Sequence, residues 1–284
     1  MAIVAEGKKE RVYISPDDQH INIAFSAQPE WKPEANLPDN TRDIRPQIYG
    51  MPTYGDLFTN RQLVALTTFS DLVSEAREKV KFDAINAGIV DDNLPLSEGG
   101  KGATAYADAV ATYLGFGISK LTDYNCQNAT WSNSRDQAAH AFTKQAIQMV
   151  WNYAEINPFA QAAGDLNVTI KGITEAFEKD LTASKSGNSQ QSDASNKLIQ
   201  NISFPLISTD PPYFDNISYA DLSDFFYVWL RRSIGKVYPD ICNTLLVPKE
   251  RELVATPYRF GGDKNKAKEF FETGLGEAFH RMKE

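Results

Sequence analysis

Hydrophobic positions recur mostly at helical spacing between residues 59 and 155 of this chain. Apolar side chains three or four residues apart predict helices over residues 59–80, 104–121 and 136–153. Thr59 and Thr104 stand at the beginnings of the first two helices, where threonine is a favourable N-cap. We therefore expect this part of the chain to be mostly helical.

The last third of the chain changes from a short apolar run to helical spacing. Residues 204–209 (Phe-Pro-Leu-Ile-Ser-Thr) are typical of a short buried strand. Asp210-Pro211-Pro212-Tyr213 follows at once, and Ser218 can cap a helix over about residues 219–232. A final helix is expected from residue 264 to residue 284, with no stop signal before the end.

Two further stretches lack a regular apolar pattern. Residues 11–15 alternate and predict a short strand, but spaced prolines then interrupt regular structure up to residue 52. The stretch 182–200 is poor in apolar residues and rich in Ser, Asn and Gln, which is typical of a flexible linker. The expected organisation is an irregular extended segment at 1–55, a mostly helical region at 56–181, the linker at 182–200, and a strand–motif–helix region at 201–284.

Composition places the chain among globular proteins. Of its 284 residues, 42% are hydrophobic and 23% are charged, and no apolar run reaches the length of a membrane span. The first residues do not form a secretory signal, so we expect a cytoplasmic protein without a membrane partner. Two distant cysteines, Cys126 and Cys242, exclude a disulfide framework or a four-cysteine zinc site and are expected to be buried thiols.

The net charge of -8 argues against a dedicated nucleic-acid-binding domain, because phosphate contacts usually require a basic surface. It leaves room for a DNA enzyme that has a local basic path beside its pocket. Three tryptophans, Trp131, Trp151 and Trp229, are expected in the core.

The Asp210-Pro211-Pro212-Tyr213 motif suits chemistry on an exocyclic amine of a base. Such a nitrogen is a poor nucleophile, because its lone pair is delocalised into the ring. Two rigid acceptors that receive both N–H groups would orient the nitrogen toward a methyl donor. Asp210 offers a carboxylate and Pro211 a carbonyl, and two successive prolines fix both φ angles. Tyr213 can stack on a base that has been flipped out of the duplex.

The motif resembles motif IV of amino-group DNA methyltransferases. The longer run 208–232, together with residues 54–63, 106–110 and 252–259, resembles the large prokaryotic adenine-specific DNA methylases that carry an N-terminal domain of unknown function and a zinc ribbon. The resemblance covers nearly the whole chain. It places this sequence in the middle to C-terminal part of such an enzyme.

The resemblance implies an α/β, Rossmann-like S-adenosylmethionine-dependent methyltransferase fold that is incomplete and has a large helical insertion. It implies DNA as the partner, S-adenosylmethionine as the cofactor and N6 of adenine as the acceptor, with a role such as restriction–modification. Asp210, Pro211, Pro212 and Tyr213 are the implied catalytic residues, and Asp210 also borders the cofactor. The glycine loop that binds this cofactor is not found in the chain. Two alternatives stay open: a non-catalytic fragment that binds DNA or a partner, and N4-cytosine specificity.

Several residues beyond the motif are candidates for the substrate site. Tyr213, Phe214, Asn216 and Tyr219 could line the base pocket, although Asn216 has an alternative role in shaping the turn. Arg259 lies between aromatic residues and before two glycines, which suits either a mobile substrate-contact loop or a plain glycine turn.

Other motifs are better explained by structure. Gly115-Phe116-Gly117 lies inside a helical pattern and predicts close helix packing. Asp221, Asp224, Arg231 and Arg232 are expected to complement the dipole of their helix.

Overall fold

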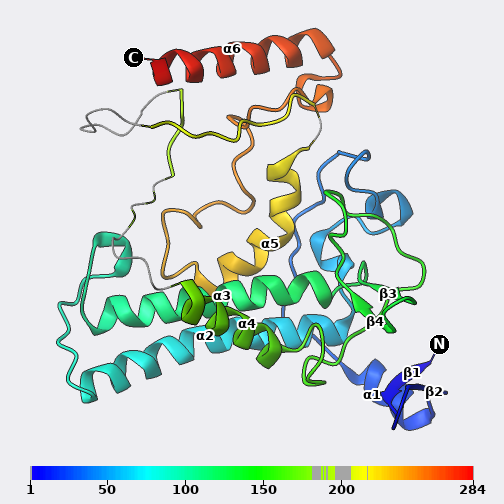
Figure 1. Cartoon of the computed structure of the whole chain (residues 1–284). Helices are drawn as coiled ribbons and strands as arrows, with labels where there is room; N and C mark the ends of the chain where they lie inside the picture. The colour runs from blue at the N-terminus through cyan, green and yellow to red at the C-terminus, as the bar shows by residue number, and fades with distance from the viewer. Residues whose placement is uncertain are drawn as a thin grey trace.

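The computed structural model describes residues 2–180, 187, 189, 191–195, 206–215 and 217–283. Its main body is a group of helices, and Figure 1 shows α2 (Asn60–Asn86) and α3 (Ala103–Tyr124) lying side by side. Both α4 (Leu166–Asp180) and α5 (Tyr219–Ile234) pack against α3, and α5 also contacts α2. α6 (Lys264–Lys283) lies apart from the α2–α3 pair, and the N-terminal end of α5 is the end nearer to it (Figure 1).

The sheets in the described residues are two small antiparallel pairs. β1 (Ile3–Glu6) pairs with β2 (Arg11–Ile14), so that Ile3 lies opposite Ile14. β3 (Thr130–Ser132) pairs with β4 (Gln137–Ala139), so that Thr130 lies opposite Ala139. Neither pair provides the parallel sheet on which a Rossmann-like fold is built. The described residues thus neither complete nor exclude the expected fold class.

The remaining elements are short. A helix, α1 (Asp18–Ser26), follows β2 and has no buried residue. Four 3₁₀ turns complete the described elements: η1 (Pro46–Tyr49), η2 (Tyr54–Leu57), η3 (Leu96–Glu98) and η4 (Pro257–Phe260). None of the described helices is long and apolar enough to cross a bilayer.

The main core is aromatic where α5 meets η2. Phe58 stacks on Phe225 with ring centroids 5.6 Å apart and meets the edge of Trp229 at 5.2 Å. Trp31 adds a further edge contact to Trp229, which is fully buried. Such large side chains contribute most of the apolar area that a core of this size removes from water.

A second, smaller core joins α6 to the loop before it. Ala255, Ala267 and Phe271 are buried there, and Leu253, Phe260 and Leu275 pack around them. This small core lies next to the Asp-Pro-Pro-Tyr segment, because the ring of Phe271 contacts Phe214.

The capping predictions hold for α2 and differ for α3. Thr59 and Gln62 form a reciprocal capping box at the beginning of α2, with N···O distances of 3.2 and 2.8 Å. The N-cap of α3 is Gly102, two residues before the predicted Thr104, which lies inside the first turn. The carboxylate of Asp91 accepts from both the amide and the hydroxyl of Thr104, and the bond to the amide lowers the pKa of Asp91.

The glycines of α3 are confirmed as close-packing positions. A Cβ atom at Gly115 would lie 2.7 Å from Cγ2 of Ile234 on α5. A Cβ atom at Gly117 would lie 2.7 Å from Cδ1 of Ile170 on α4. Their role is therefore to let two neighbouring helices approach α3.

The helix predicted over residues 136–153 is wrong. After β4 this stretch has no regular structure apart from a bridge at Ile147, which exchanges backbone hydrogen bonds with Asp43 and Arg45. The amide of Phe142 donates to the Asp123 carboxylate at 2.9 Å. These tertiary bonds use the backbone groups that a helix would need, so they override the apolar spacing.

Trp151 is also placed differently from the prediction, since its side chain is 74% exposed. Trp229 is fully buried as expected, and Trp131 is partly buried. Cys126 is buried and Cys242 is only partly so. The expected linker at 182–200 lies mainly outside the described residues.

Candidate functional site

The Asp-Pro-Pro-Tyr motif lies on an exposed segment without regular secondary structure. Asp210 and Pro211 are exposed, Pro212 is partly buried, and the side chain of Tyr213 is 55% exposed. Both proposed acceptors, the carboxylate of Asp210 and the carbonyl of Pro211, therefore belong to residues that face solvent.

The strand expected before the motif is not formed by residues 206–209, and residues 204 and 205 lie outside the described part. Leu206 is 97% exposed and Ile207 is 45% exposed, so this apolar run is not buried. The described residues offer it no neighbouring strand, and an isolated strand leaves its backbone groups unpaired. The motif accordingly does not lie at the edge of a sheet in this structure.

The chain is anchored directly after the motif. The amide of Ala255 donates to the carbonyl of Phe214 at 2.7 Å, and the ring of Phe214 meets Phe271 edge-on at 5.2 Å. Nη1 of Arg42 donates to the carbonyl oxygen of Asp215 at 2.7 Å and to its carboxylate at 2.8 Å. Three distant parts of the chain thus hold the residues that follow the motif, while the motif itself stays exposed.

The first turn of α5 is capped by a distant carboxylate. Ser218 occupies the N-cap position as predicted, but its side chain makes no capping bond; its hydroxyl lies 3.4 Å from that of Thr256. Instead, Oε1 of Glu252 accepts from the amide of Ala220 at 2.8 Å. A carboxylate is favoured at this end of a helix, where the amides carry partial positive charge.

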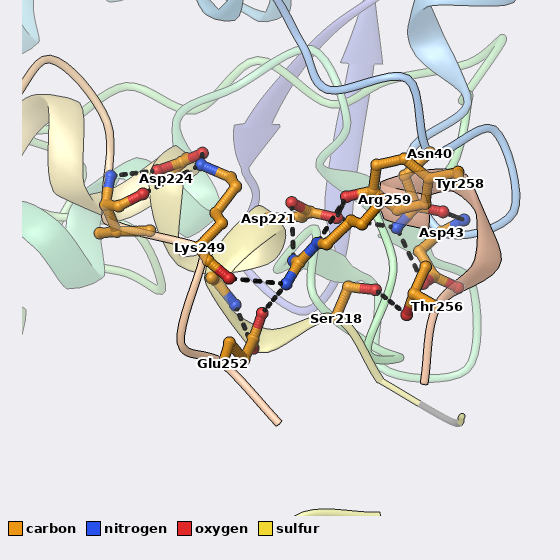
Figure 2. Close-up of polar contacts among 12 residues, drawn as sticks. Asn40, Asp43, Ser218, Asp221, Asp224, Lys249, Glu252, Thr256, Tyr258 and Arg259 are labelled. Atoms are coloured by element: carbon orange, nitrogen blue, oxygen red, sulfur yellow. Dashed lines mark hydrogen bonds and ion pairs between the residues drawn. The ribbon is translucent and has the colours of Figure 1, made fainter. Parts of the chain in front are cut away.

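A buried ion pair joins α5 to η4 (Figure 2). Oδ1 of Asp221 lies 3.2 Å from Nη2 of Arg259. Oδ2 of Asp221 accepts hydrogen bonds from the hydroxyl of Tyr258 and, at 3.1 Å, from the side-chain amide of Asn40. Arg259 also pairs with Glu252, with 2.7 Å between Nη1 and Oε2. Burial raises the pKa of the Tyr258 hydroxyl, and its bond to Asp221 raises it further.

A second buried pair lies one turn further along α5. Oδ2 of Asp224 is 2.6 Å from Nζ of Lys249, and Oδ1 accepts from the amide of Val247 at 2.8 Å (Figure 2). Burial raises the pKa of the Asp224 carboxyl, although the bond to Lys249 opposes that rise. The hydroxyl of Tyr54 is 3.4 Å from the same carboxylate, and burial raises its pKa as well.

These charges act as a scaffold rather than as reactants. Each buried carboxylate is paired with a cation and bonded to further donors, which is what burial of a charge requires. The guanidinium of Arg259 is bound to Asp221 and Glu252, and its side chain is only 14% exposed. Gly261 and Gly262, with φ of 63° and 87°, end the 3₁₀ turn, which favours the glycine-turn alternative for this segment.

Sequence reasoning placed Asp221 and Asp224 at a helix dipole and missed their burial. One signal could have found it, since the two aspartates are three residues apart and directly precede the apolar run at residues 225–230. Asn40 and Tyr54 carried no comparable signal, because they join the site only through tertiary folding.

Tyr219 lines a cavity whose walls do not include Tyr213. The cavity has a volume of about 430 Å³ and lies between the first turns of α5 and residues 142–145. Its walls are Phe142, Thr143, Lys144, Gln145, Ile217, Tyr219, Ala220, Leu222, Ser223 and Phe226. Tyr219 remains 45% exposed and Phe214 46% exposed, and Asn216 lies outside the described residues. The structure thus separates the candidates for base contact instead of gathering them in one pocket.

The described residues form no glycine loop of the kind expected to bind S-adenosylmethionine. The fold that binds this cofactor uses a glycine loop between a strand and a helix, and the described strands lead into no such loop. Gly115 and Gly117 are inside α3 and packed against side chains. The described residues also contain no group of three or more His, Cys, Asp or Glu side chains that could hold a metal ion.

Comparisons of this chain with protein-family models, with curated proteins and with solved structures give no match. The site therefore has to be interpreted from its own chemistry.

Proposed function

We propose that this chain carries the amine-acceptor half of a DNA methyltransferase, acting on N6 of adenine. The proposal rests on the Asp210-Pro211-Pro212-Tyr213 motif, which lies on a solvent-facing segment. The residues that follow the motif are held by hydrogen bonds from distant parts of the chain. Since the described residues contain no strand-to-helix glycine loop, the proposal assigns donor binding to residues other than these.

The motif's contribution is to orient the acceptor nitrogen. One N–H of the amine donates to the carboxylate of Asp210, and the other donates to the carbonyl of Pro211. This pair of bonds directs the nitrogen lone pair away from the two acceptors, toward the face from which a methyl group would arrive. The fixed φ angles of the two prolines reduce the freedom that the acceptors would lose on binding.

Tyr213 supplies the stacking surface in this proposal. Its ring is 55% exposed and lies next to the acceptors in sequence, so a flipped base could stack on it without displacing core residues. Stacking is sequence-tolerant, whereas the two acceptors select a base that carries an exocyclic amine.

A binding titration tests this function with two single-stranded oligonucleotides. One strand contains adenine at a central position, and the other contains purine there, which lacks the amine. The chain should bind the adenine strand several-fold more tightly, because the purine leaves both acceptors without donors. Equal affinity for the two strands would remove the basis of the proposal.

Asp210→Ala is the informative variant, and Asp240→Ala is its matched control. Both aspartates are exposed, so neither change should unfold the chain. The first should remove the preference for adenine and the second should keep it. A third strand with cytosine at the same position tests N4-cytosine specificity, which a preference for cytosine over adenine would support.

A second candidate is a non-catalytic module that binds DNA or a partner. It is favoured by the absence of a strand-to-helix glycine loop from the described residues. Calorimetry of this chain with S-adenosylmethionine tests this second candidate, since tight binding would exclude a module that cannot hold the cofactor.

A further inference from the structure

Two segments that are far apart in sequence run side by side and form one surface. The amide of Ile147 donates to the carbonyl of Asp43 at 2.7 Å, and the amide of Arg45 donates to the carbonyl of Ile147 at 3.0 Å. Ile44 and Ile147 are both buried beneath this contact. We name the surface formed by residues 40–49 and 142–151 the Trp151 face.

The Trp151 face exposes two aromatic rings in contact. Trp151 is 74% exposed and Tyr49 is 48% exposed, and their ring centroids are 5.3 Å apart at an angle of 82°. Of the four tryptophans, all of which are described, only Trp151 is exposed. Ile48 beside them is 60% exposed. Large apolar side chains left together in solvent commonly mark a binding surface.

The same face is positive although the whole chain is negative. The two segments contain three cations, Arg42, Arg45 and Lys144, and one carboxylate, Asp43, which gives a formal charge of +2 against -8 for the chain. Arg42 is already paired with both Asp43 and Asp215, so the positive charge that the face presents comes from Arg45 and Lys144. Within the described residues, Arg45 and Lys144 are exposed and form no ion pair.

We infer that the Trp151 face binds single-stranded nucleic acid, with bases stacked on Trp151 and Tyr49 and phosphates near Arg45 and Lys144. Exposed aromatic rings combined with cations along a surface are the usual elements of single-strand binding, because every base has a face that can stack. The positive formal charge of the face complements phosphates and disfavours a basic protein partner.

The face also leads toward the proposed acceptor site. Lys144 lines the cavity of about 430 Å³ that Tyr219 borders, at the beginning of α5 and shortly after the Asp-Pro-Pro-Tyr segment. The inference rests on the proposed function in its choice of DNA as the polymer. It adds the surface that would hold the strand beside the target base.

An oligothymidylate of about twelve nucleotides tests the inference independently of the acceptor motif. Thymine has no exocyclic amine, so this strand tests the Trp151 face without engaging the two acceptors of the motif. Wild-type chain should bind the strand at low salt, and stacking on Trp151 should quench tryptophan fluorescence. If the wild-type chain bound oligothymidylate but showed no preference for adenine over purine, the proposed function would be refuted and the Trp151 face would remain supported.

Two variants with matched controls locate the binding. Trp151→Ala should weaken binding about tenfold or more, Trp151→Phe should retain most of it, and Tyr106→Ala, at an exposed tyrosine of α3, should change nothing. Arg45→Gln should reduce the slope of log affinity against log salt by about 0.7, whereas Lys120→Gln should not. Because Trp151 is exposed, all the variants should keep the wild-type unfolding midpoint.

Two results would overturn the inference. One is equal affinity of wild type and Trp151→Ala for oligothymidylate. The other is no binding at low salt together with self-association in sedimentation that Trp151→Ala abolishes, which would make the face a protein–protein contact.

Discussion

At the scale of single residues, Asp221 joins three parts of the chain through one buried carboxylate. It lies on α5, pairs with Arg259 of η4, and accepts a hydrogen bond from Asn40 near the N-terminal end. Both side chains are largely withdrawn from solvent, with exposed fractions of 0% for Asp221 and 14% for Arg259. Removal of either partner leaves the other charge buried with fewer bonds.

Asp221→Ala should therefore lower the free energy of unfolding by about 3 kcal/mol, the typical cost of breaking a buried pair. Asp221→Asn should cost less, because its amide oxygen can still accept from Tyr258 and Asn40. Urea denaturation measures both. Asp240→Ala, at an exposed position, should stay within about 0.5 kcal/mol of wild type. A change at Asp221 no larger than this control would show that the pair does not stabilise the fold.

The two cysteines should differ in reactivity. Complete burial raises the pKa of the Cys126 thiol to about 12, so the reactive thiolate is almost absent at pH 8. Burial also raises the pKa of the partly buried Cys242. A disulfide reagent should label Cys242 alone in the native chain and both thiols in urea.

Cys126 also links stability to pH. Because its pKa is higher in the folded state, the folded chain retains a proton that the unfolded chain loses above pH 9. This contribution to stability is complete below pH 9 and falls as the pH rises toward 12. Cys126→Ser should reduce that alkaline loss. Rapid native labelling of Cys126 in a Cys242→Ser background would contradict its burial.

At the scale of elements, two glycines of α3 allow α5 and α4 to pack closely against it. Gly115→Ala and Gly117→Ala would each place a Cβ atom 2.7 Å from an isoleucine side chain, so each should lower the free energy of unfolding by about 1–2 kcal/mol. Gly172→Ala in α4 is the control, because no atom lies within 4 Å of its added Cβ. That change should stabilise the chain by about 0.5–1 kcal/mol. Stabilisation at all three glycines in thermal unfolding would refute close packing.

Helices with strong apolar periodicity and a local cap could be predicted from the sequence. α2 begins at Thr59 as its capping box indicates, and α5 and α6 begin where expected. The helix prediction over residues 136–153 failed because distant hydrogen-bond partners decide the conformation there, as at Ile147 and Phe142. α1 was not predicted, and α4 was not predicted as an individual helix although it lies in the region expected to be mostly helical.

The candidate site likewise has one part that could be predicted from the sequence and one part that could not. The motif could be recognised because its chemistry lies in consecutive residues. Its anchors could not, because Arg42, Ala255 and Phe271 reach the segment only after folding.

At the scale of the whole molecule, two cores meet at the residues after the motif. The main core holds α5, and the smaller core around Phe271 holds the carbonyl of Phe214 through Ala255. A mutation in the smaller core should therefore alter the conformation of the motif without changing Asp210 itself.

Phe271→Ala should speed hydrogen exchange at the amide of Ala255, because that amide is bonded to Phe214 and Phe271 packs on the same residue. It should also reduce the preference for adenine. Phe82→Ala, at a position of α2 that is 64% exposed, should alter neither property. Unchanged exchange at Ala255 would show that α6 does not secure the segment.

The central claim is that Asp210 accepts a hydrogen bond from the exocyclic amine of a base. The most direct measurement is a thermodynamic cycle that combines Asp210→Ala with replacement of adenine by purine in the bound strand. If the carboxylate and the amine interact, the cycle should give a coupling free energy of about 1.5–3 kcal/mol, as is typical of hydrogen bonds to charged groups. A coupling free energy of zero would contradict the account.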